Sequence, residues 1–354
     1  MKPIRILHLP SYHPAVSKIY DEDRMLIANP HQNSFSDLKH ISVAEFVRRF
    51  PLKSYDIVHI HFEYYLISLP KLKQLLQYFK KHKKPIVWTW HDKKSLLDNK
   101  IDFYYEKLLF QSADKIITLT NGMEKWIRST FGKHKYPIEI LAHGFIASLS
   151  LISTILKKSK KDKNLFTLLI GDFREPKEYI QSIINFLQSD ELKKAKLQVI
   201  FRPLNIYSSG YKKLKWDILA FHQIIQHPRV RILCKVFFND KEIAKEFYKS
   251  HAVILPYKWG DHSGQIELAK DCGCHVIVSD VGFYKEQWDK IWQYKVSDNS
   301  FEEIPERYVR QLVAAFKSPS LSPLGSIREK EHKDFLDRHY RIYTDTIKRM
   351  HRDD

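Results

Sequence analysis

Residues 262–282 read HSGQIELAKDCGCHVIVSDVG, and this stretch predicts a polar loop, a helix and a buried strand. Ser263 is a favoured N-cap residue and Gly273 is a favoured residue just beyond a helix C-terminus, so we expect the helix to lie between them. Residues 276–278 form an apolar β-branched run, as expected for a parallel strand covered on both faces. The loop before the helix presents free N–H groups and the positive end of the helix dipole, which suits a phosphate or diphosphate. The pattern fits equally well an ordinary strand–helix unit that binds no ligand.

The length and the net charge of the chain limit the number of domains and the kinds of partner that we expect. The chain has 354 residues, enough for about two domains that each bury a core. Its formal net charge of +18 indicates an anionic partner, which could be a nucleic acid, an acidic membrane surface or a phosphorylated ligand. No apolar run reaches the roughly 18 residues that span a bilayer. The N-terminal stretch also lacks the apolar core and cleavage site of a signal peptide.

Cysteine usage indicates the compartment. The three cysteines are an odd number in a long chain, which argues against a disulfide framework. Cys272 and Cys274 flank a glycine, but no Cys or His pair at ligand spacing follows them, which disfavours a zinc site. We therefore expect a cytoplasmic protein without a metal ion.

One stretch concentrates positive charge. No acidic residue occurs between Tyr64 and His91, and this stretch contains six lysines: Lys71, Lys73, Lys80, Lys81, Lys83 and Lys84. Apolar residues recur at helical spacing from Leu69 to Phe79, which predicts a basic amphipathic helix. Its apolar stripe can pack on a sheet while the lysines are merely solvated. The lysines can also attract anionic lipid headgroups, at roughly 1 kcal/mol for each residue near the surface.

Short apolar runs alternate with helical patterns along the whole chain. In the first part we expect strands at 4–9, 56–61, 85–90, 115–120 and 138–142, and helices at 18–28, 70–82, 102–112 and 122–131. In the second part we expect strands at 165–171, 197–201, 230–234, 252–255 and 275–279, and helices at 175–187, 240–249 and 263–272. A long helix at 329–350 has a predicted buried stripe of Phe335, Leu336, Tyr340, Tyr343 and Ile347.

This alternation predicts an α/β protein with two Rossmann-like, doubly wound domains that face each other across a cleft. The first domain would span residues 1–150 and the second residues 164–325. Residues 151–163 contain a charged run of low apolar content and are the predicted linker. Residues 326–354 would form a C-terminal helix that packs back towards the first domain.

Ligands of open α/β sheets bind beyond the carboxyl ends of the strands. His91 and His143 follow two predicted strands of the first domain, and Arg174 and Lys177 follow the first strand of the second. Together with the helix that starts near Ser263, these residues could hold a diphosphate without a P-loop. No Gly-x-Gly-x-x-Gly motif occurs, which disfavours a dinucleotide oxidoreductase.

These stretches, in their order and spacing, resemble a GT-B glycosyltransferase, and in particular glycosyltransferase family 4 and its relatives. In the first domain the resemblance rests on DIVHIH at 56–61, TWHD at 89–92, ADKIIT at 113–118 and AHG at 142–144. In the second domain GDFREPK at 171–177 resembles the Gly-x-x-Arg-x-x-Lys stretch of one subgroup. That subgroup's donor motif is similar to LPY at 255–257, SG at 263–264, Gly273 and DVG at 280–282.

The resemblance implies roles for individual residues. Arg174 and Lys177 would hold the donor diphosphate and stabilise its charge as the sugar leaves. His91 would contact the transferred sugar or the acceptor hydroxyl. The implied donor-binding residues are Tyr257, Gly260, Asp261, His262, Ser263, Gly264, Gln265 and Glu267, and the implied acceptor-side residues are Tyr12, His13 and His143. Ordinary structural roles compete with these: His91 could bond to backbone at a strand end, and Arg174 and Lys177 could lie in a solvated helix start.

The sequence departs from the family in two places: the loop at 10–14 after the first strand has no glycine, and the donor motif lacks a pair of residues. Many members carry two glutamates eight positions apart, whereas the matching positions here hold Gly260 and Leu268, with Glu267 one residue earlier. The subgroup with Ser-Gly at the loop also lacks this pair, so the departure is compatible with activity. The family usually needs no metal, and the sequence has no acidic metal motif.

The expected function is therefore transfer of a hexose from a nucleotide-diphosphate sugar to a hydroxyl of a lipid-linked or polysaccharide acceptor, with retention of configuration. A UDP- or GDP-sugar would be the co-substrate, bound by the second domain, with no other cofactor, and the first domain would hold the acceptor. The basic surface would dock the protein at the anionic inner face of the cytoplasmic membrane. One alternative is a nucleic-acid-binding protein, which strands covered on both faces disfavour. The other is a non-catalytic GT-B scaffold, which the missing glutamate pair favours and Arg174 and Lys177 disfavour.

Overall fold

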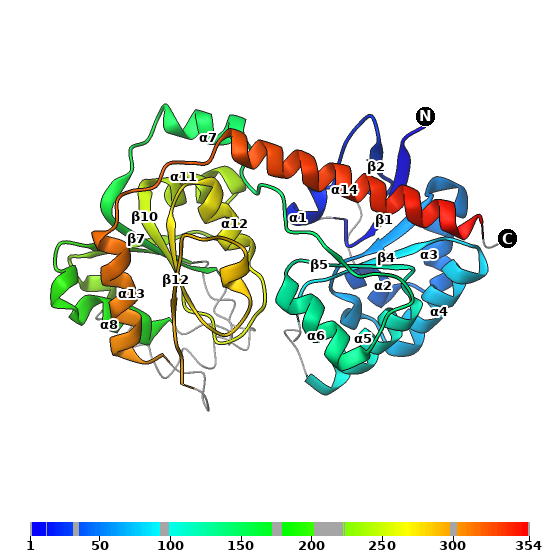
Figure 1. Ribbon diagram of the computed structural model, residues 1–354, viewed down its shortest axis with the longest axis horizontal. Coiled ribbons are helices and arrows are strands. Elements are labelled where there is room, and N and C mark those ends of the chain that lie inside the picture. The colour runs from blue at the N-terminus through cyan, green and yellow to red at the C-terminus, as the bar shows by residue number, and fades with distance from the viewer. Residues whose placement is uncertain are drawn as a thin grey trace. The chain divides into compact units, whose positions relative to one another are not determined.

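The computed structural model describes residues 2–11, 13–30, 35–92, 99–171, 179–201, 222, 224–297 and 303–352. The chain divides into two compact units (Figure 1). Unit 1 comprises Met1–Gly144 and Lys330–Asp354, and unit 2 comprises Phe145–Glu329. Each unit is built on its own six-stranded sheet in which all paired strands are parallel. The predicted pair of Rossmann-like α/β domains is therefore confirmed.

The sheet of unit 1 has the strand order β2-β1-β3-β4-β5-β6. Its strands are β1 (Ile4–Leu9), β2 (Met25–Ile27), β3 (Ile57–Ile60), β4 (Ile86–Trp90), β5 (Lys115–Thr118) and β6 (Glu139–Ile140). Its first helices are α1 (Pro14–Ser17), α2 (Phe35–His40), α3 (Val43–Arg49), α4 (Leu69–Lys81), α5 (Asn99–Ser112) and α6 (Asn121–Phe131). Every residue of β3, β4 and β5 is buried, which explains why these strands read as continuous apolar runs.

Helix α4 confirms the predicted basic amphipathic helix. Its buried residues are Leu72, Leu75, Leu76 and Phe79, which recur at helical spacing. Lys73 and Lys80 lie on the exposed face, as do Lys81 and Lys83 at and beyond its C-terminus. The helix therefore packs one side in the core and presents basic side chains on the other.

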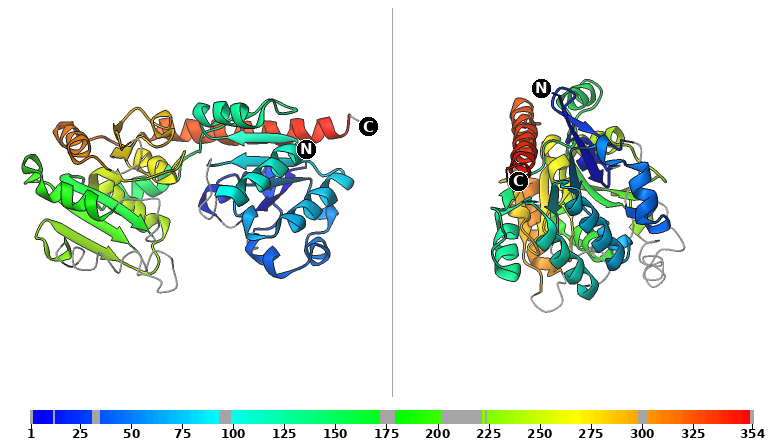
Figure 2. Two further views of the ribbon diagram at one scale, coloured as in Figure 1. Left: turned by 90° about the horizontal axis from the view of Figure 1, so that it is seen from below. Right: turned by 90° about the vertical axis from the view of Figure 1, so that its right-hand side faces the viewer.

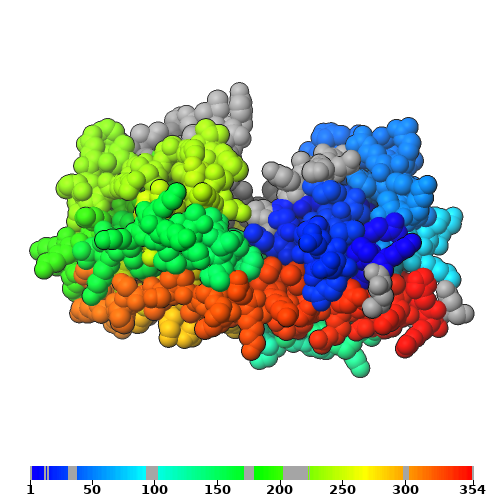
Figure 3. Space-filling model, turned by 90° about the horizontal axis from the view of Figure 1, so that it is seen from above, coloured from blue at the N-terminus to red at the C-terminus, as the bar shows by residue number. Residues whose placement is uncertain are grey.

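The last helix, α14 (Ser326–Met350), begins in unit 2, and from Lys330 onwards it belongs to unit 1. Phe335, Ile342 and Tyr343 are buried in one cluster with residues of β1, β3 and β4, and Leu336, Tyr340 and Ile347 pack against that cluster. The predicted apolar stripe is thus confirmed. In Figure 3 the red surface of the last residues lies beside the blue surface of the first residues of the chain. Arg24 joins the two by an ion pair with Asp337 at 2.6 Å.

The sheet of unit 2 has the strand order β12-β11-β10-β7-β8-β9. Its strands are β7 (Asp162–Gly171), β8 (Lys196–Phe201), β9 (Val230–Cys234), β10 (Ser250–Leu255), β11 (His275–Ser279) and β12 (Ile291–Tyr294). Its helices are α7 (Leu149–Leu156), α8 (Ile180–Gln188), α11 (Asp240–Lys249), α12 (Gly264–Asp271) and α13 (Pro305–Lys317). In the views of Figure 2 helices lie on both sides of this sheet.

The central strand β10 shows why both faces of this sheet are apolar. Ala252 and Ile254 belong to one buried cluster, with residues of α8 and α13. Val253 and Leu255 belong to another, with residues of α7, α11 and α12. Successive side chains of a strand point to opposite faces, so a strand between two helical layers must be apolar at every position.

Two expectations differ from the structure. Residues 18–28 were predicted to be helical, but this prediction is wrong, since they contain the edge strand β2. The N–H groups of Arg24 and Met25 donate to Asp21 O, and this turn lets Met25–Ile27 pair in parallel with β1. Residues 151–163 lie inside unit 2, where they include most of α7 and the start of β7. The chain instead passes from unit 1 to unit 2 at Gly144–Phe145.

Candidate functional site

In unit 1 a small pocket lies at the carboxyl ends of the parallel strands. Its cavity is about 10 Å³, which is about the room that one water molecule needs. It is lined by Ile19, His61, Thr89, His91, Ile117, Leu119, Leu141, His143 and His339. His61 follows β3, His91 follows β4 and His143 follows β6. The strand-end positions that parallel α/β sheets use for ligands are therefore occupied by imidazoles.

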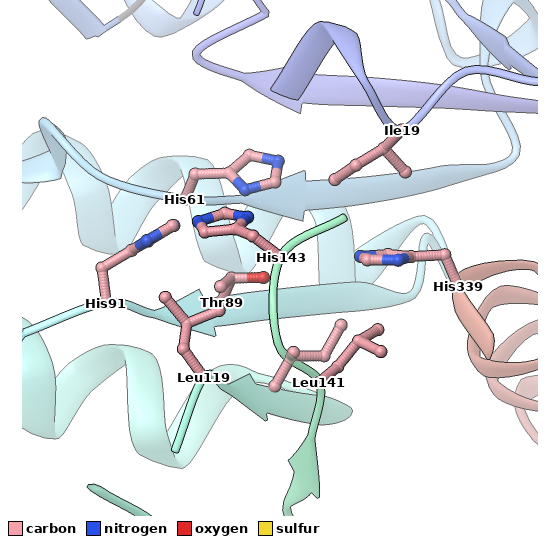
Figure 4. A pocket seen from close by; sticks show the side chains of 9 residues that line it. Ile19, His61, Thr89, His91, Leu119, Leu141, His143 and His339 are labelled. Carbon is pink, nitrogen blue, oxygen red and sulfur yellow. The ribbon is translucent and has the colours of Figure 1, made fainter. Parts of the chain in front are cut away.

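Three of these rings lie close together. The ring centroids of His61 and His91 are 6.2 Å apart, and those of His91 and His143 are 5.8 Å apart. Figure 4 shows the three side chains converging on one end of the pocket, with His339 of α14 at the other. A neutral imidazole offers one donor and one acceptor, so the three rings can bind sugar hydroxyls or accept a hydroxyl proton.

The other predicted acceptor-side residues are on the first strand's loop. Tyr12 lies outside the described residues. His13 packs edge-on against Phe62, with ring centroids 4.7 Å apart, and Phe62 packs edge-on against His91 at 5.4 Å. The structure thus links His13 to the histidine pocket through one phenylalanine.

His61 and His339 of the pocket belong to a buried group of histidines in the core of unit 1. His8, His59, His61 and His339 are all at most 3% exposed. His8 Nδ1 is 2.9 Å from His61 Nε2, and the ring nitrogens of His59 are 2.6 Å from Tyr343 Oη and 2.7 Å from Thr89 Oγ1. Burial lowers the pKa of His8 to about 3 and that of His339 to about 4. Burial and the neighbouring imidazoles also hold the pKa values of His59 and His61 well below the ordinary value, so all four rings are neutral at pH 7.

Sequence reasoning missed His8, His59, His61 and His339 as a group. One signal was available, because His59 and His61 are two positions apart in a predicted strand and so must share a face of the sheet. The partner His8 could not be assigned without the pairing of β1 with β3, which sets His8 opposite His59.

In unit 2 the predicted donor-binding residues come together at the N-terminus of α12. Ser263 is the N-cap, and its Oγ accepts a hydrogen bond from Gln265 N–H at 3.2 Å and lies 2.8 Å from Tyr257 Oη. Ser263 N–H donates to Gln287 Oε1 at 2.9 Å. The N–H groups of Ser263 and Gln265, in the loop expected to face a diphosphate, are therefore bonded within the protein. Gly264, between them, is exposed.

Glycines allow the loop before α12 to pack closely. Gly260 has φ of 132°, in the region that favours glycine, and a Cβ there would overlap Tyr284 Oη. A Cβ on Gly282 would overlap the backbone of Gly260. Tyr257 and Tyr284 stack with ring centroids 5.3 Å apart. Gly282, from the DVG motif, thus fixes the loop that carries Gly260, Asp261 and His262.

Glu267 lies in the interior of unit 2 rather than at its surface. It is 1% exposed, and its carboxylate accepts hydrogen bonds from Gln287 Nε2 at 2.9 Å and from Arg328 Nη2 at 3.0 Å. Burial opposes its charge, but His262 and Arg328 nearby hold the pKa of Glu267 below its ordinary value. Its role here is to connect α12, the loop at His262 and the start of α14.

Arg328 also binds Asp271, at the other end of α12. Arg328 Nε donates to Asp271 Oδ1 at 2.6 Å, and Asp271 Oδ2 accepts from the N–H groups of Ile146 and Ala147 at 2.7 and 2.8 Å. Burial raises the pKa of Asp271 to about 6, so its carboxylate is ionised beside Arg328 at neutral pH. One guanidinium therefore serves two buried carboxylates of the same helix.

The predicted diphosphate-holding residues Arg174 and Lys177 lie outside the described part of the chain. Of the other predicted residues, His91 and His143 share the pocket of unit 1, and those from Tyr257 to Glu267 share the start of α12 in unit 2. None of the helices among the described residues is long and apolar enough to cross a membrane.

Two parallel α/β units of this kind define the class of GT-B glycosyltransferase folds, and solved structures bear this out. Sucrose-phosphate synthase from Thermosynechococcus elongatus is similar with a TM-score of 0.62 and 14% identity, over 98% of each chain. The UDP-forming alpha,alpha-trehalose-phosphate synthase from Burkholderia vietnamiensis gives a TM-score of 0.63 at 9% identity, also over 98% of each chain. The pneumococcal O-GlcNAc transferase GtfA, solved in complex with UDP and GlcNAc, gives 0.57 at 13% identity, over 87% of this chain and 59% of that chain.

The sequence gives a narrower match. Residues 9–147 match the family model of Glycosyltransferase Family 4. No curated protein sequence matches the chain. The matched segment lies almost wholly in unit 1 and includes His13, His61, His91 and His143. The family match and the GT-B fold together support glycosyl transfer as the general reaction.

Proposed function

We propose that the chain transfers a hexose from a UDP- or GDP-sugar to a hydroxyl of a lipid-linked or polysaccharide acceptor, with retention of configuration and with no metal ion at the donor diphosphate. The observation that carries this proposal is the fixed loop and helix start at residues 257–264 of unit 2. It occurs in a chain whose first 147 residues include the match to Glycosyltransferase Family 4.

The donor diphosphate is proposed to bind at the N-terminus of α12. A helix N-terminus carries about half a positive elementary charge, and the exposed Gly264 lies at that point. The bonds of Ser263 with Gln287 and Tyr257 hold this helix start in place before the ligand arrives. A site that needs no rearrangement stabilises developing charge more effectively than a mobile one.

Arg174 and Lys177 are proposed to complete the diphosphate site. A guanidinium and an ammonium neutralise the charge that appears on the leaving nucleoside diphosphate as the glycosidic bond breaks. Positive charge at the start of a predicted helix is otherwise unfavourable, which supports a ligand role.

The reacting hydroxyl of the acceptor is proposed to bind at the histidine pocket of unit 1, whose cavity has room for a group of about the size of one water molecule. His61, His91 and His143 line it, and their imidazoles can donate to or accept from hydroxyl groups. His91 is the proposed contact with the reacting hydroxyl or the transferred sugar. His61 adds to this set a residue that the family resemblance did not assign.

The first test is a thermal-shift panel with UDP, GDP, ADP, CMP and their common sugar conjugates, at low and moderate salt. A ligand at about 100 times its dissociation constant adds roughly 2.7 kcal/mol of stability. We expect a clear shift with UDP or GDP and not with the others. No shift with any of these ligands would favour the non-catalytic scaffold instead.

A second test addresses the diphosphate residues. Arg174→Ala and Lys177→Ala should each lower the slow hydrolysis of the donor sugar by about 10²- to 10³-fold, the effect of losing one charge-stabilising group. Lys193→Ala is the matched control, because Lys193 is an exposed lysine of unit 2 that pairs with Asp190. If both variants hydrolysed the donor sugar at the unaltered rate, the assignment of Arg174 and Lys177 to the diphosphate site would be wrong.

Membrane docking is proposed for the basic face of α4. Lys73, Lys80, Lys81 and Lys83 are exposed there, and each basic residue near an anionic surface contributes about 1 kcal/mol. Changing all four to glutamine should abolish cosedimentation with vesicles that contain anionic lipid. The control changes four exposed lysines of unit 2, Lys157, Lys158, Lys193 and Lys194, and should retain binding. Equal losses in both would mean that net charge alone drives the association.

A further inference from the structure

Three histidines of unit 1 form a compact group inside the sheet. His8 is on β1 and lies opposite His59 on β3, and His61 follows two positions later on the same face. One ring nitrogen from each of the three lies within 4.8 Å of the other two. All three side chains are buried, with His61 the most exposed at 3%.

Hydrogen bonding within the protein does not account fully for this group. Native proteins give nearly every buried polar atom a partner. The described residues give the His8 ring a partner at Nδ1, which is His61 Nε2, and none at Nε2. His61 contacts other imidazoles: its Nε2 is 2.9 Å from His8 Nδ1, and its ring centroid is 3.9 Å from that of His59. A buried polar nitrogen without a partner is costly, so the hydrogen bonds of this group leave room for a further ligand.

We propose that His8, His59 and His61 bind one divalent first-row transition-metal ion, with zinc as the physiological candidate. Neutral imidazole is the commonest protein ligand for such ions. A set of nitrogen ligands favours zinc, cobalt, nickel or copper over magnesium and calcium, which require oxygen.

The distances are close to those that a metal requires. Zinc–nitrogen bonds of about 2.0–2.1 Å place two ligand nitrogens of a tetrahedral site roughly 3.3 Å apart. His8 Nδ1 and His61 Nε2, at 2.9 Å, already approach that spacing. The ring centroid of His59 is 3.9 Å from that of His61, and its ligand nitrogen lies within 4.8 Å of the other two.

The surroundings supply the rest of a metal site. A metal-binding imidazole usually hydrogen-bonds through its other ring nitrogen. His59 has Tyr343 Oη at Nδ1 and Thr89 Oγ1 at Nε2, so binding the ion through one nitrogen releases one of these bonds and keeps the other. His61 also lines the pocket, whose cavity has room for one water as a fourth ligand. Because Tyr343 belongs to α14, the ion would fix the helix that closes unit 1 as well as strands β1 and β3. This site is separate from the proposed donor site in unit 2, which needs no metal.

The test uses the full-length chain without a polyhistidine tag. Zinc content is measured by mass spectrometry after purification without chelator, and again after removal of metal and incubation with equimolar zinc. We expect one zinc per chain and a melting temperature that falls when a chelator removes it. Cobalt in place of zinc should give the visible absorption of a tetrahedral site without a sulfur-to-metal band, which separates this site from the cysteines. Absence of zinc both as purified and after incubation would overturn the proposal.

A pair of matched variants locates the ion. His8→Gln removes one ligand, while His134→Gln alters another buried histidine of unit 1, whose ring nitrogens contact the backbone carbonyls of Tyr136 and Ala113. We expect zinc to be lost in the first and retained in the second. Far-ultraviolet circular dichroism of both, in chelator, controls for folding. If His8→Gln binds zinc as tightly as the unaltered chain, the ion is elsewhere and the assignment is wrong.

If His8→Gln does not fold, Thr89→Val tests the site in its place, because loss of the Thr89 bond should alter the cobalt spectrum only if His59 is a ligand.

Discussion

The two units share one sheet architecture but bury polar groups in different ways. Unit 1 buries neutral imidazoles on the strands themselves, at His8, His59 and His61. Unit 2 buries formal charges on a helix, with Glu267 and Asp271 on α12 paired to Arg328. A neutral ring needs only hydrogen-bond partners, whereas a buried carboxylate needs a cation that stays in place. The polar interior of unit 1 should therefore tolerate the loss of a partner far better than that of unit 2.

The largest effect that we expect is from Arg328→Met. Arg328 is 4% exposed, and its removal leaves two buried carboxylates without a cation. Breaking a buried pair in this way costs about 3–5 kcal/mol. The free energy of unfolding, measured by urea denaturation, should fall by that amount.

Arg5→Met is the matched control for this prediction. Arg5 pairs with Asp56 at 2.7 Å, but the two side chains are 43% and 33% exposed, so the loss should not exceed about 1 kcal/mol. Adding Glu267→Gln and Asp271→Asn to Arg328→Met should restore part of the stability, because the uncompensated charges are then gone. Equal losses for Arg328→Met and Arg5→Met would contradict the contrast between the units.

A smaller effect is expected in unit 1 from Tyr343→Phe. The change removes the partner of His59 Nδ1 and leaves that nitrogen buried and unpaired, which costs about 1–2 kcal/mol for a neutral group. Tyr340→Phe is the control, since Tyr340 lies three residues earlier on α14 and is only partly buried. Both are measured by urea unfolding in chelator. If Tyr343→Phe lowered the free energy of unfolding as much as Arg328→Met, the buried imidazoles would depend on their partners as strongly as the buried carboxylates do.

The same contrast explains what the sequence could predict. The start and end of α12 depend on local chemistry: Ser263 caps the first turn, and Gly273, with φ of 65°, follows the last. The apolar run of β11 and the stripe of α14 are also local patterns, and they were predicted correctly. The edge strand β2 was not, because three residues are too few to show a period.

The buried polar groups depend on contacts between distant residues, so the sequence could not reveal them. Glu267 meets Arg328 across 61 positions, and His8 meets His61 across 53. Lys161 falls in the predicted charged linker, yet its Nζ donates to the carbonyl of Ser250 at the start of β10 and to those of Cys272 and Gly273 just beyond α12. A residue type can suggest a buried partner, but only the pairing of elements identifies it.

The smallest effect that we expect is from Trp292→Phe in unit 2. This change tests whether unit 2 also contains an imidazole that must stay neutral. His275 Nε2 bonds to Pro319 O at 3.0 Å, and Trp292 Nε1–H donates to His275 Nδ1 at 3.1 Å. An indole nitrogen can only donate, so Nδ1 must be unprotonated. Burial lowers the pKa of His275, with Lys161 and Lys290 adding to the effect.

The pH dependence follows from this lowered pKa. Above the ordinary histidine pKa of about 6.5 both the folded and unfolded forms are neutral, whereas below it the unfolded chain takes up a proton more readily than the folded one. The stabilising contribution of His275 is therefore present above about pH 6.5 and is lost as the pH falls. Trp292→Phe should cost about 1 kcal/mol at about pH 8, from the lost hydrogen bond, and less at about pH 5.5. Urea unfolding at the two pH values measures the difference.

Trp126→Phe is the control, because Trp126 packs against Trp90 and Phe131, and its cost should not change with pH. If the cost of Trp292→Phe were constant with pH, His275 would not be held neutral by the indole. The need for a neutral ring would then be shown for the histidine group of unit 1 and not for His275.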